Sequence, residues 1–247
     1  MRIVALSLLV ALAACGGDDS NLDYPAFPNP TKAPDAAPGP DSAPPAADPV
    51  INEIFYGQDG ADSAATEYIE VYGDPNTSYS SYSLVWLEGN SVGSGLGTIR
   101  GIIAVGTTDS SGLFSITAED GIAATFDNNS QTWLLVQGLT GSVDDDLDTD
   151  EDGVLDLTPW ASVADALGIT DAGASDEFYV DIGGTTYGVT VDRYPANPST
   201  DGGGAARIPD GMDTDTLTDW MLIPETGVAN DNTEANSTPG ATNTTGT

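Results

Sequence analysis

An aspartate-rich segment, Asp144–Asp156, carries the clearest chemical signal in the sequence and reads DDDLDTDEDGVLD. Its residues follow the spacing of the first part of a calcium loop, in which positions 1, 3, 5, 6 and 9 are taken by Asp148, Asp150, Asp152, Gly153 and Asp156. Alternating carboxylates converge on a hard cation, and the glycine permits the sharp turn that this requires. Val154, at position 7, would add its backbone carbonyl. The spacing therefore predicts a structural calcium site, with the affinity of roughly 10⁻⁴–10⁻³ M that is typical of extracellular modules.

The segment is not an EF-hand. Position 12, where an EF-hand has a bidentate glutamate, is Pro159, and we expect no helix on either side. It is closer to the aspartate-rich loops of thrombospondin-type and dockerin-type repeats, which resemble it at five or six positions. The alternative is a solvated acidic loop on an already acidic protein. Calcium would instead relieve the repulsion among the crowded carboxylates and tie the loop to Thr132–Val136 and Trp160.

The sequence contains no histidine, which excludes Ser-His-Asp and Cys-His catalysis and histidine-ligated zinc or iron. Chemistry that needs only carboxylates, such as glycoside hydrolysis, remains open. Its candidates are Glu53, Glu67 and Glu70, but nothing sets them apart from the other acids of the chain, 39 in total. We expect these three to accept hydrogen bonds at strand edges, paired with Arg207 or Arg193, and we expect no catalytic site.

Two further groups of acids carry weaker signals. Asp59 and Asp62, with Glu67, border the first loop of the folded region and indicate at most a weak second cation site. The other group follows a Pro-x-Gly turn, where we expect its members only to solvate the turn: Asp210, Asp213 and Asp215.

The charge of the chain is extreme, with 39 acidic against five basic residues and a formal net charge of −34. Such a surface repels a phosphate backbone unless divalent cations bridge the two. Nucleic acid is therefore excluded as a direct partner. The acids serve either solubility or cation binding, and we expect solvation to account for most of them.

Residues 1–14 are typical of a bacterial signal segment, with Arg2 followed by an apolar run that is too short to span a bilayer. The run ends in Leu-Ala-Ala-Cys15, which resembles the bacterial lipobox. The resemblance implies cleavage before Cys15, diacylglycerol on its thiol and acylation of the new amine. Cys15 is the only cysteine, so it cannot form an internal disulfide. The alternative is a buried N-terminal helix with an incidental cysteine.

The residues after the cysteine indicate the membrane to which the protein is delivered and the length of its stalk. By resemblance to lipoprotein sorting rules, Gly16 in place of an aspartate favours delivery to the outer membrane, on its periplasmic face or at the cell surface. Residues 15–48 are rich in Pro, Ala and Asp, a composition that favours extended polyproline II over a packed core. We expect an acidic stalk that reaches on the order of 100 Å when extended.

From Val50 onward the sequence favours short strands over helices. In EYIEVYG, the side chains of Tyr68, Glu70 and Tyr72 should share one face of a strand. Only Ser162–Leu167 suits a helix, and it suits a strand equally well. The predicted strands are 50–56, 67–73, 83–88, 101–105, 122–126, 132–136, 177–181, 187–192 and 220–223, with turn residues between them. Many short strands without α/β alternation predict an all-β sandwich.

All four tryptophans lie in strand-like contexts, so we expect them in the core rather than on a sugar-binding platform: Trp86, Trp133, Trp160 and Trp220.

Two motifs of the folded region resemble the lamin tail domain as bacteria use it. INEIFYGQDGADSAATEYIEVYG is similar to the opening of that domain, and ARIPDGMDTDTLTDWML followed by STPGATN is similar to its close. The resemblance implies an immunoglobulin-like β-sandwich over residues 49–243, with a short tail at 244–247 and a structural, anchoring or binding role. The region is longer than the compact form of the family, so insertions are expected between residues 89 and 205.

Two functions remain at this point. The first is a membrane-anchored exported lipoprotein whose non-catalytic module binds another protein or an envelope polymer, with membrane lipid as the partner of Cys15. The alternative is a carboxylate-dependent glycan hydrolase or a carbohydrate-binding module at the cell envelope.

Overall fold

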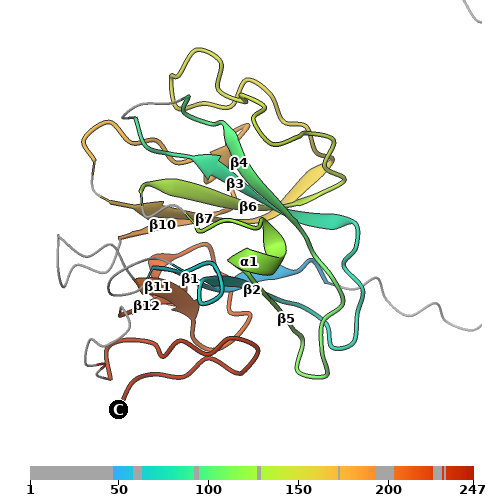
Figure 1. The fold of residues 1–247 in the computed structure, drawn as a ribbon, viewed down its shortest axis with the longest axis vertical. Coiled ribbons are helices and arrows are strands. Elements are labelled where there is room, and N and C mark those ends of the chain that lie inside the picture. The colour runs from blue at the N-terminus through green and yellow to red at the C-terminus, as the bar shows by residue number, and fades with distance from the viewer. Residues whose placement is uncertain are drawn as a thin grey trace, which may run out of the picture. The chain divides into compact units, whose positions relative to one another are not determined.

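The computed structural model describes residues 47–57, 63–91, 95–126, 129–171, 173–192, 203–224, 230 and 232–247. The expected signal segment, Cys15 and nearly all of the expected stalk lie outside these residues. Within them the chain is almost entirely β, and two five-stranded sheets face each other as layers (Figure 1). An all-β, sandwich-like fold is therefore confirmed.

The first sheet is antiparallel throughout and has the order β12–β11–β1–β2–β5. Its strands are β1 (Val50–Gly57), β2 (Tyr68–Tyr72), β5 (Leu113–Thr117), β11 (Gly203–Arg207) and β12 (Trp220–Ile223). The register between β1 and β2 shifts between Ile51 and Glu53. This bulge lets Ile51 and Ile54 both enter the core, although they are three positions apart.

The second sheet has the order β10–β7–β6–β3–β4, with β10 parallel to β7 and the other pairs antiparallel. Its strands are β3 (Tyr82–Glu88), β4 (Ile99–Ala104), β6 (Gln131–Gln137), β7 (Ser162–Thr170) and β10 (Gly188–Asp192). The smaller described elements are the helix α1 (Ala118–Gly121), the 3₁₀ turn η1 (Leu217–Asp219) and the hairpin of β8 (Asp181–Ile182) and β9 (Thr185–Thr186).

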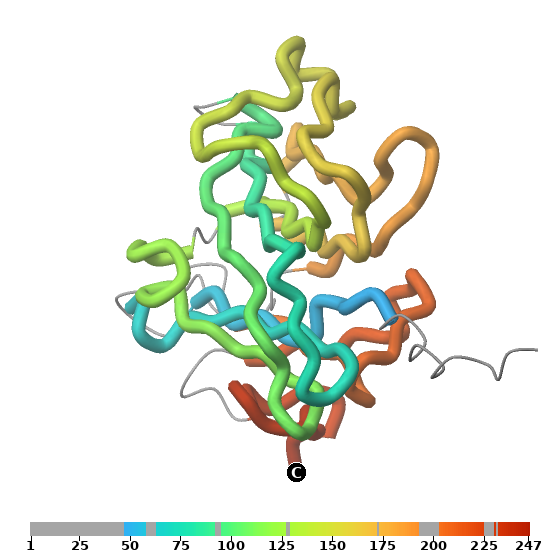
Figure 2. The backbone as a smooth tube through the Cα atoms, turned by 90° about the vertical axis from the view of Figure 1, so that its right-hand side faces the viewer, coloured from blue at the N-terminus to red at the C-terminus, as the bar shows by residue number. Residues whose placement is uncertain are grey.

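The apolar side chains form one core between the sheets and a further cluster on each outer face. Alternate residues of β6 show this, since Trp133 belongs to the central core and Leu134 to the cluster outside the second sheet. The segments before β7 and after it cover that outer cluster, while the C-terminal segment lies beyond the first sheet at the opposite end of the molecule (Figure 2). Because β3 and β6 are buried on both faces, their sequences are nearly continuous apolar runs.

The structure corrects two predicted strands. Residues 122–126 follow α1 as a turn, and Phe126 reaches the core from that turn, with its ring centroid 4.9 Å from that of Trp133. Residues 177–181 are irregular up to Asp181, where the short β8 begins. In both segments the apolar residues pack into a core without pairing in a sheet.

The ambiguous segment Ser162–Leu167 belongs to strand β7. Of the tryptophans, Trp86, Trp133 and Trp220 are buried in the central core, and Trp160 is partly buried against the cluster outside the second sheet. The predicted core position is confirmed for Trp86, Trp133 and Trp220, whereas Trp160 is only partly buried and lies outside the central core.

Candidate functional site

The aspartate-rich segment forms a loop between β6 and β7, at the end of the molecule opposite the C-terminal segment (Figure 2). Backbone bonds hold it against the start of β4: the N–H of Ile99 donates to the carbonyl of Asp145 at 2.9 Å, and that of Asp144 donates to the carbonyl of Ile99 at 2.9 Å. Leu147 is buried in the outer cluster with Ile99 and Tyr179. The loop therefore has a fixed base, and its acidic residues other than Asp148 are exposed.

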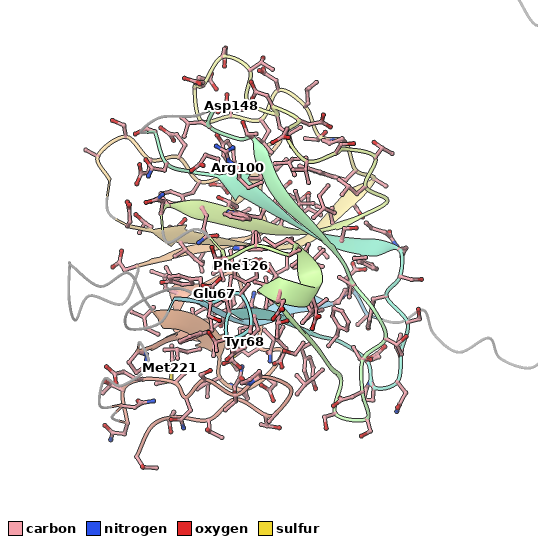
Figure 3. All side chains as sticks on the ribbon, in the orientation of Figure 1. Glu67, Tyr68, Arg100, Phe126, Asp148 and Met221 are labelled. Carbon is pink, nitrogen blue, oxygen red and sulfur yellow. The ribbon has the colours of Figure 1, made fainter. Side chains whose placement is uncertain are left out.

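Asp148 organises the loop from a fully buried position beneath it (Figure 3). Its Oδ2 accepts hydrogen bonds from the N–H of Gly153 at 2.9 Å and from the Tyr179 hydroxyl at 2.9 Å, and its Oδ1 accepts one from the N–H of Asp152 at 3.2 Å. Gly153 has a φ of +82°, a backbone conformation that suits glycine. These contacts fold the chain back over one carboxylate.

Three carboxylates converge at this loop and could hold a metal ion. Asp148, Asp150 and Asp156 each bring an oxygen to a group in which all such atoms lie within 4.8 Å of one another. Asp152 is outside this group, and its Oδ1 accepts the N–H of Val154 at 3.0 Å. The Val154 side chain points to solvent, with 63% of its surface exposed. Of the predicted side-chain ligands, the structure thus brings together positions 1, 3 and 9.

The electrostatics of the loop favour a cation. The negative charge of Asp152, followed by slight burial and by the charges of Asp156 and Asp148, raises the pKa of Asp150. Hydrogen bonds from the hydroxyl and the N–H of Thr149 lower the pKa of Asp156. A positive ion among these groups would offset the repulsion that Asp150 experiences, because it lies close to all three carboxylates.

Tyr179 connects this loop to the second sheet. Its hydroxyl donates to Asp148, while its backbone N–H donates to Oγ1 of Thr132 in β6 at 3.1 Å. The loop is thus linked to Thr132 through a tyrosine that no sequence motif singles out, and this link is separate from the calcium-mediated one expected from the sequence. Its only sequence signal is its position in the segment 177–181, which the sequence predicts as a strand.

Removing the Tyr179 hydroxyl should loosen the loop. We expect Tyr179→Phe to lower the free energy of unfolding by about 1–2 kcal/mol, because a buried carboxylate loses one hydrogen bond. Urea denaturation in EDTA measures this, with Tyr187→Phe, a tyrosine of the same outer cluster that does not bond to Asp148, as the control. Equal effects of the two substitutions would contradict the assigned contact.

No family model, curated protein or solved structure matches this chain. Among the described residues, no helix is long and apolar enough to cross a membrane.

The glutamates considered for catalysis are buried hydrogen-bond acceptors. Glu53 accepts bonds from the Tyr68 hydroxyl and from the N–H of Thr238 at 2.9 Å, and Glu70 accepts bonds from the Asn52 amide at 2.9 Å and the N–H of Gly240 at 2.7 Å. The remaining candidate, Glu67, accepts the N–H of Phe126 at 2.6 Å. The predicted acceptor role is confirmed, but Glu53 and Glu70 lie within the interior strands β1 and β2 rather than at strand edges. These carboxylates join strands to distant loops.

The motifs from the two ends of the folded region meet at Glu53 and Glu70. Asn243 donates to the backbone carbonyls of Asn52 at 3.3 Å and of Arg207 at 3.0 Å. Oδ1 of Asp210 accepts from the Asn52 amide at 3.1 Å and from the N–H of Asn243 at 3.0 Å. Four segments that are far apart in the sequence thus form one polar network across the outer face of the first sheet.

Arg207 has partners other than the predicted ones. Its Nη2 donates to both carboxylate oxygens of buried Asp165, at 2.9 and 3.0 Å, and its Nη1 forms an ion pair with Asp213 at 3.0 Å. The proposed pairing with the three glutamates is therefore wrong for Arg207, because the strand carries its side chain toward β7. Arg193, Asp59 and Asp62 lie outside the described residues.

The acids after the Pro-x-Gly turn do more than solvate it. Asp210 is half-buried within the polar network and Asp213 pairs with Arg207, so the solvation interpretation is wrong for both. Asp215 is exposed, as that interpretation requires.

Proposed function

We propose that this chain is an exported lipoprotein, acylated at Cys15, whose lamin-tail-like, immunoglobulin-like domain is a non-catalytic module for tethering or binding. Calcium held by Asp148, Asp150 and Asp156 stabilises its acidic loop. The module stands at the outer membrane on an acidic stalk and engages another protein or an envelope polymer. Nucleic acid is no partner of a chain with a formal net charge of −34.

The polar network between the terminal motifs is the observation that carries this proposal. It supports a lamin-tail-like module because the segments that bear the resemblance, around Asn52, Glu70, Arg207 and Asn243, are the ones that bond to one another. The resemblance rests on sequence alone, and neither motif requires the other to be near. In this structure the opening and closing motifs contact each other, so both contribute to one hydrogen-bonded network.

The same network supports a non-catalytic role. A hydrolase that uses two carboxylates needs them at a substrate-accessible surface, one to protonate the leaving group and one to act as base or nucleophile. Glu53 and Glu70 are instead fully buried beneath Thr238 and Gly240, which donate hydrogen bonds to them. Their chemistry is used to hold the C-terminal segment in place.

Calcium fits the loop better than other common metals. The three converging ligands are all carboxylates, and hard oxygen donors favour calcium or magnesium over zinc or copper. Calcium also tolerates irregular ligand geometry, whereas magnesium demands a near-ideal octahedron. Asp148 would anchor the ion from below, and Asp150 and Asp156 would close over it from the exposed side.

The proposed acylation and membrane attachment of the protein are tested by Cys15→Ser in the full chain. We expect the unsubstituted protein to incorporate labelled palmitate and to sediment with membranes, and the variant to do neither, because one or more acyl chains supply the membrane affinity. Both forms should share one melting temperature, since the substitution lies outside the folded module. Unlabelled, soluble protein with an intact Cys15 would contradict the proposal.

A further inference from the structure

An open groove lies beside the acidic loop on the surface of the domain. It has a volume of about 420 Å³ and is lined by Asp145, Asp146, Leu147, Leu157, Thr158 and Pro159. Leu147, Leu157 and Pro159 supply apolar surface, and Asp145 and Asp146 add negative charge at the solvent-exposed side. The carbonyl of Leu147 accepts the N–H groups of Asp156 at 2.8 Å and Leu157 at 3.1 Å, which fixes the two walls relative to each other.

Exposed apolar side chains are concentrated in the segment that contributes the groove. Five large apolar side chains are exposed among the described residues. Three of them belong to the loop between β6 and β7: Val143 (49%), Val154 (63%) and Leu157 (52%). A loop that only solvates an acidic protein has no need of exposed aliphatic side chains. Of these three, Leu157 lines the groove together with Leu147 and Pro159, and an apolar surface bordered by charged residues is typical of an interaction site.

The negative charge around the groove favours a partner with basic residues. The segment Asp144–Asp156 contains eight acids and no base. An anionic lipid surface or nucleic acid would be repelled, whereas lysine and arginine would be attracted. The combination of an apolar floor and an acidic rim therefore complements an aliphatic side chain that has basic residues on both sides.

We propose that the groove docks an extended, basic segment of a partner protein, which inserts one or two aliphatic side chains between Leu157 and Pro159. The flanking lysines or arginines of that segment then face Asp145 and Asp146. This docking site deepens the proposed function, since it rests on the module having a binding role and names the chemistry of what it binds. It does not require an ion at Asp148, Asp150 and Asp156.

The test uses the full chain and a fluorescent peptide in which two leucines are flanked on each side by two lysines. Fluorescence anisotropy should show saturable binding that weakens as salt is raised. We expect Leu157→Ser to weaken binding at least fivefold and the combined change Asp145→Asn and Asp146→Asn to do the same. Leu217→Ser is the matched control, because Leu217 is equally exposed at 59% but lies in η1, far along the chain from the groove, and it should leave binding unchanged.

Additional peptides, variants and vesicles separate insertion of aliphatic side chains from attraction by charge and from lipid binding. A peptide with serines in place of the leucines should bind at least fivefold more weakly; equal binding would mean attraction by charge alone and would overturn the proposal. Equal affinity of Leu157→Ser and Leu217→Ser would also overturn it, as would binding to phosphatidylglycerol vesicles in calcium without peptide binding. Asp150→Asn separates the two claims, because it should abolish calcium binding and leave peptide binding unchanged. Unsubstituted protein that binds calcium but not the peptide would reject the groove alone, and loss of peptide binding in Asp150→Asn would reject a groove that is independent of the ion.

Discussion

Replacing Arg207 by methionine should lower the free energy of unfolding by about 3–5 kcal/mol, because it leaves the buried carboxylate of Asp165 without its partner. Arg207 is 1% exposed, and its Nε also donates to the carbonyl of Ile51 at 2.8 Å. The guanidinium carbon lies 4.5 Å from the centre of the Trp220 ring. One side chain thus links β11 to β1, β7 and β12, so its loss weakens contacts in both sheets.

Urea denaturation measures this effect, with Arg100→Met as the matched control. Arg100 pairs with Glu88 at 3.0 Å but is 29% exposed, so its loss should cost less than about 1 kcal/mol. Replacing Asp165 by leucine as well as Arg207 by methionine should recover part of the loss, because a paired set of apolar groups removes the uncompensated charge. Equal costs for the two arginine substitutions would contradict the role assigned to Arg207.

The free energy of unfolding in EDTA should fall as the pH is raised from about 5 to about 8. Burial raises the pKa of Glu70 from its ordinary value of 4.5 to about 7, and burial also raises the pKa of Glu53 beside it. The folded protein therefore holds protons that the unfolded chain releases above pH 4.5, and that advantage is lost as the pH passes 7. Glu70 alone accounts for a loss on the order of 3 kcal/mol, and repulsion among the other acids adds in the same direction.

The pH profile of the free energy of unfolding tests this directly. Glu70→Gln should reduce the slope of the profile between about pH 5 and 8 without removing it, because burial also raises the pKa values of Glu53 and Asp165. Glu119→Gln, which changes an exposed acid in α1, should leave the slope unchanged. Below about pH 4 the trend should reverse, because hydrogen bonds lower the pKa values of Asp109 and Asp156 and these groups stabilise the fold only when ionised. A profile that rises steadily from pH 5 to 8 would be incompatible with buried, proton-holding glutamates.

Strand alternation made much of this fold predictable. The Tyr68, Glu70 and Tyr72 face of β2 could be separated from the Ile69 and Val71 face because side chains alternate along a strand. That the outer face would also be buried could not be predicted, since its cover comes from residues 238–243, far away in the sequence.

Strand β11 was missed for a physical reason. Its sequence, GGAAR, has little intrinsic preference for strands, yet it pairs between β1 and β12. A side chain at Gly204 would put its Cβ 2.0 Å from the carbonyl oxygen of Ile54, so only glycine allows this close approach. Small residues selected by tertiary packing resemble a loop when the local sequence is considered alone.

The spacing of the carboxylates at the candidate site could be predicted from the sequence, but the burial of Asp148 could not. Carboxylates at loop positions 1, 3 and 9 could be found from sequence, and the structure brings those three together. The burial of Asp148 under Tyr179 had no local signal, because the two residues are 31 positions apart. For the same reason Asp165, an unremarkable acid within β7, could not be matched with Arg207.

Calcium binding by the acidic loop is tested by the free energy of unfolding, measured as calcium is titrated from EDTA to about 10 mM. With a dissociation constant of roughly 10⁻⁴–10⁻³ M, we expect a gain of about 1.4–2.7 kcal/mol. The gain should vanish in Asp150→Asn and persist in Asp144→Asn, which removes the same charge from the same loop outside the converging group. No gain with the unsubstituted protein, or equal gains in both variants, would contradict a calcium-held loop.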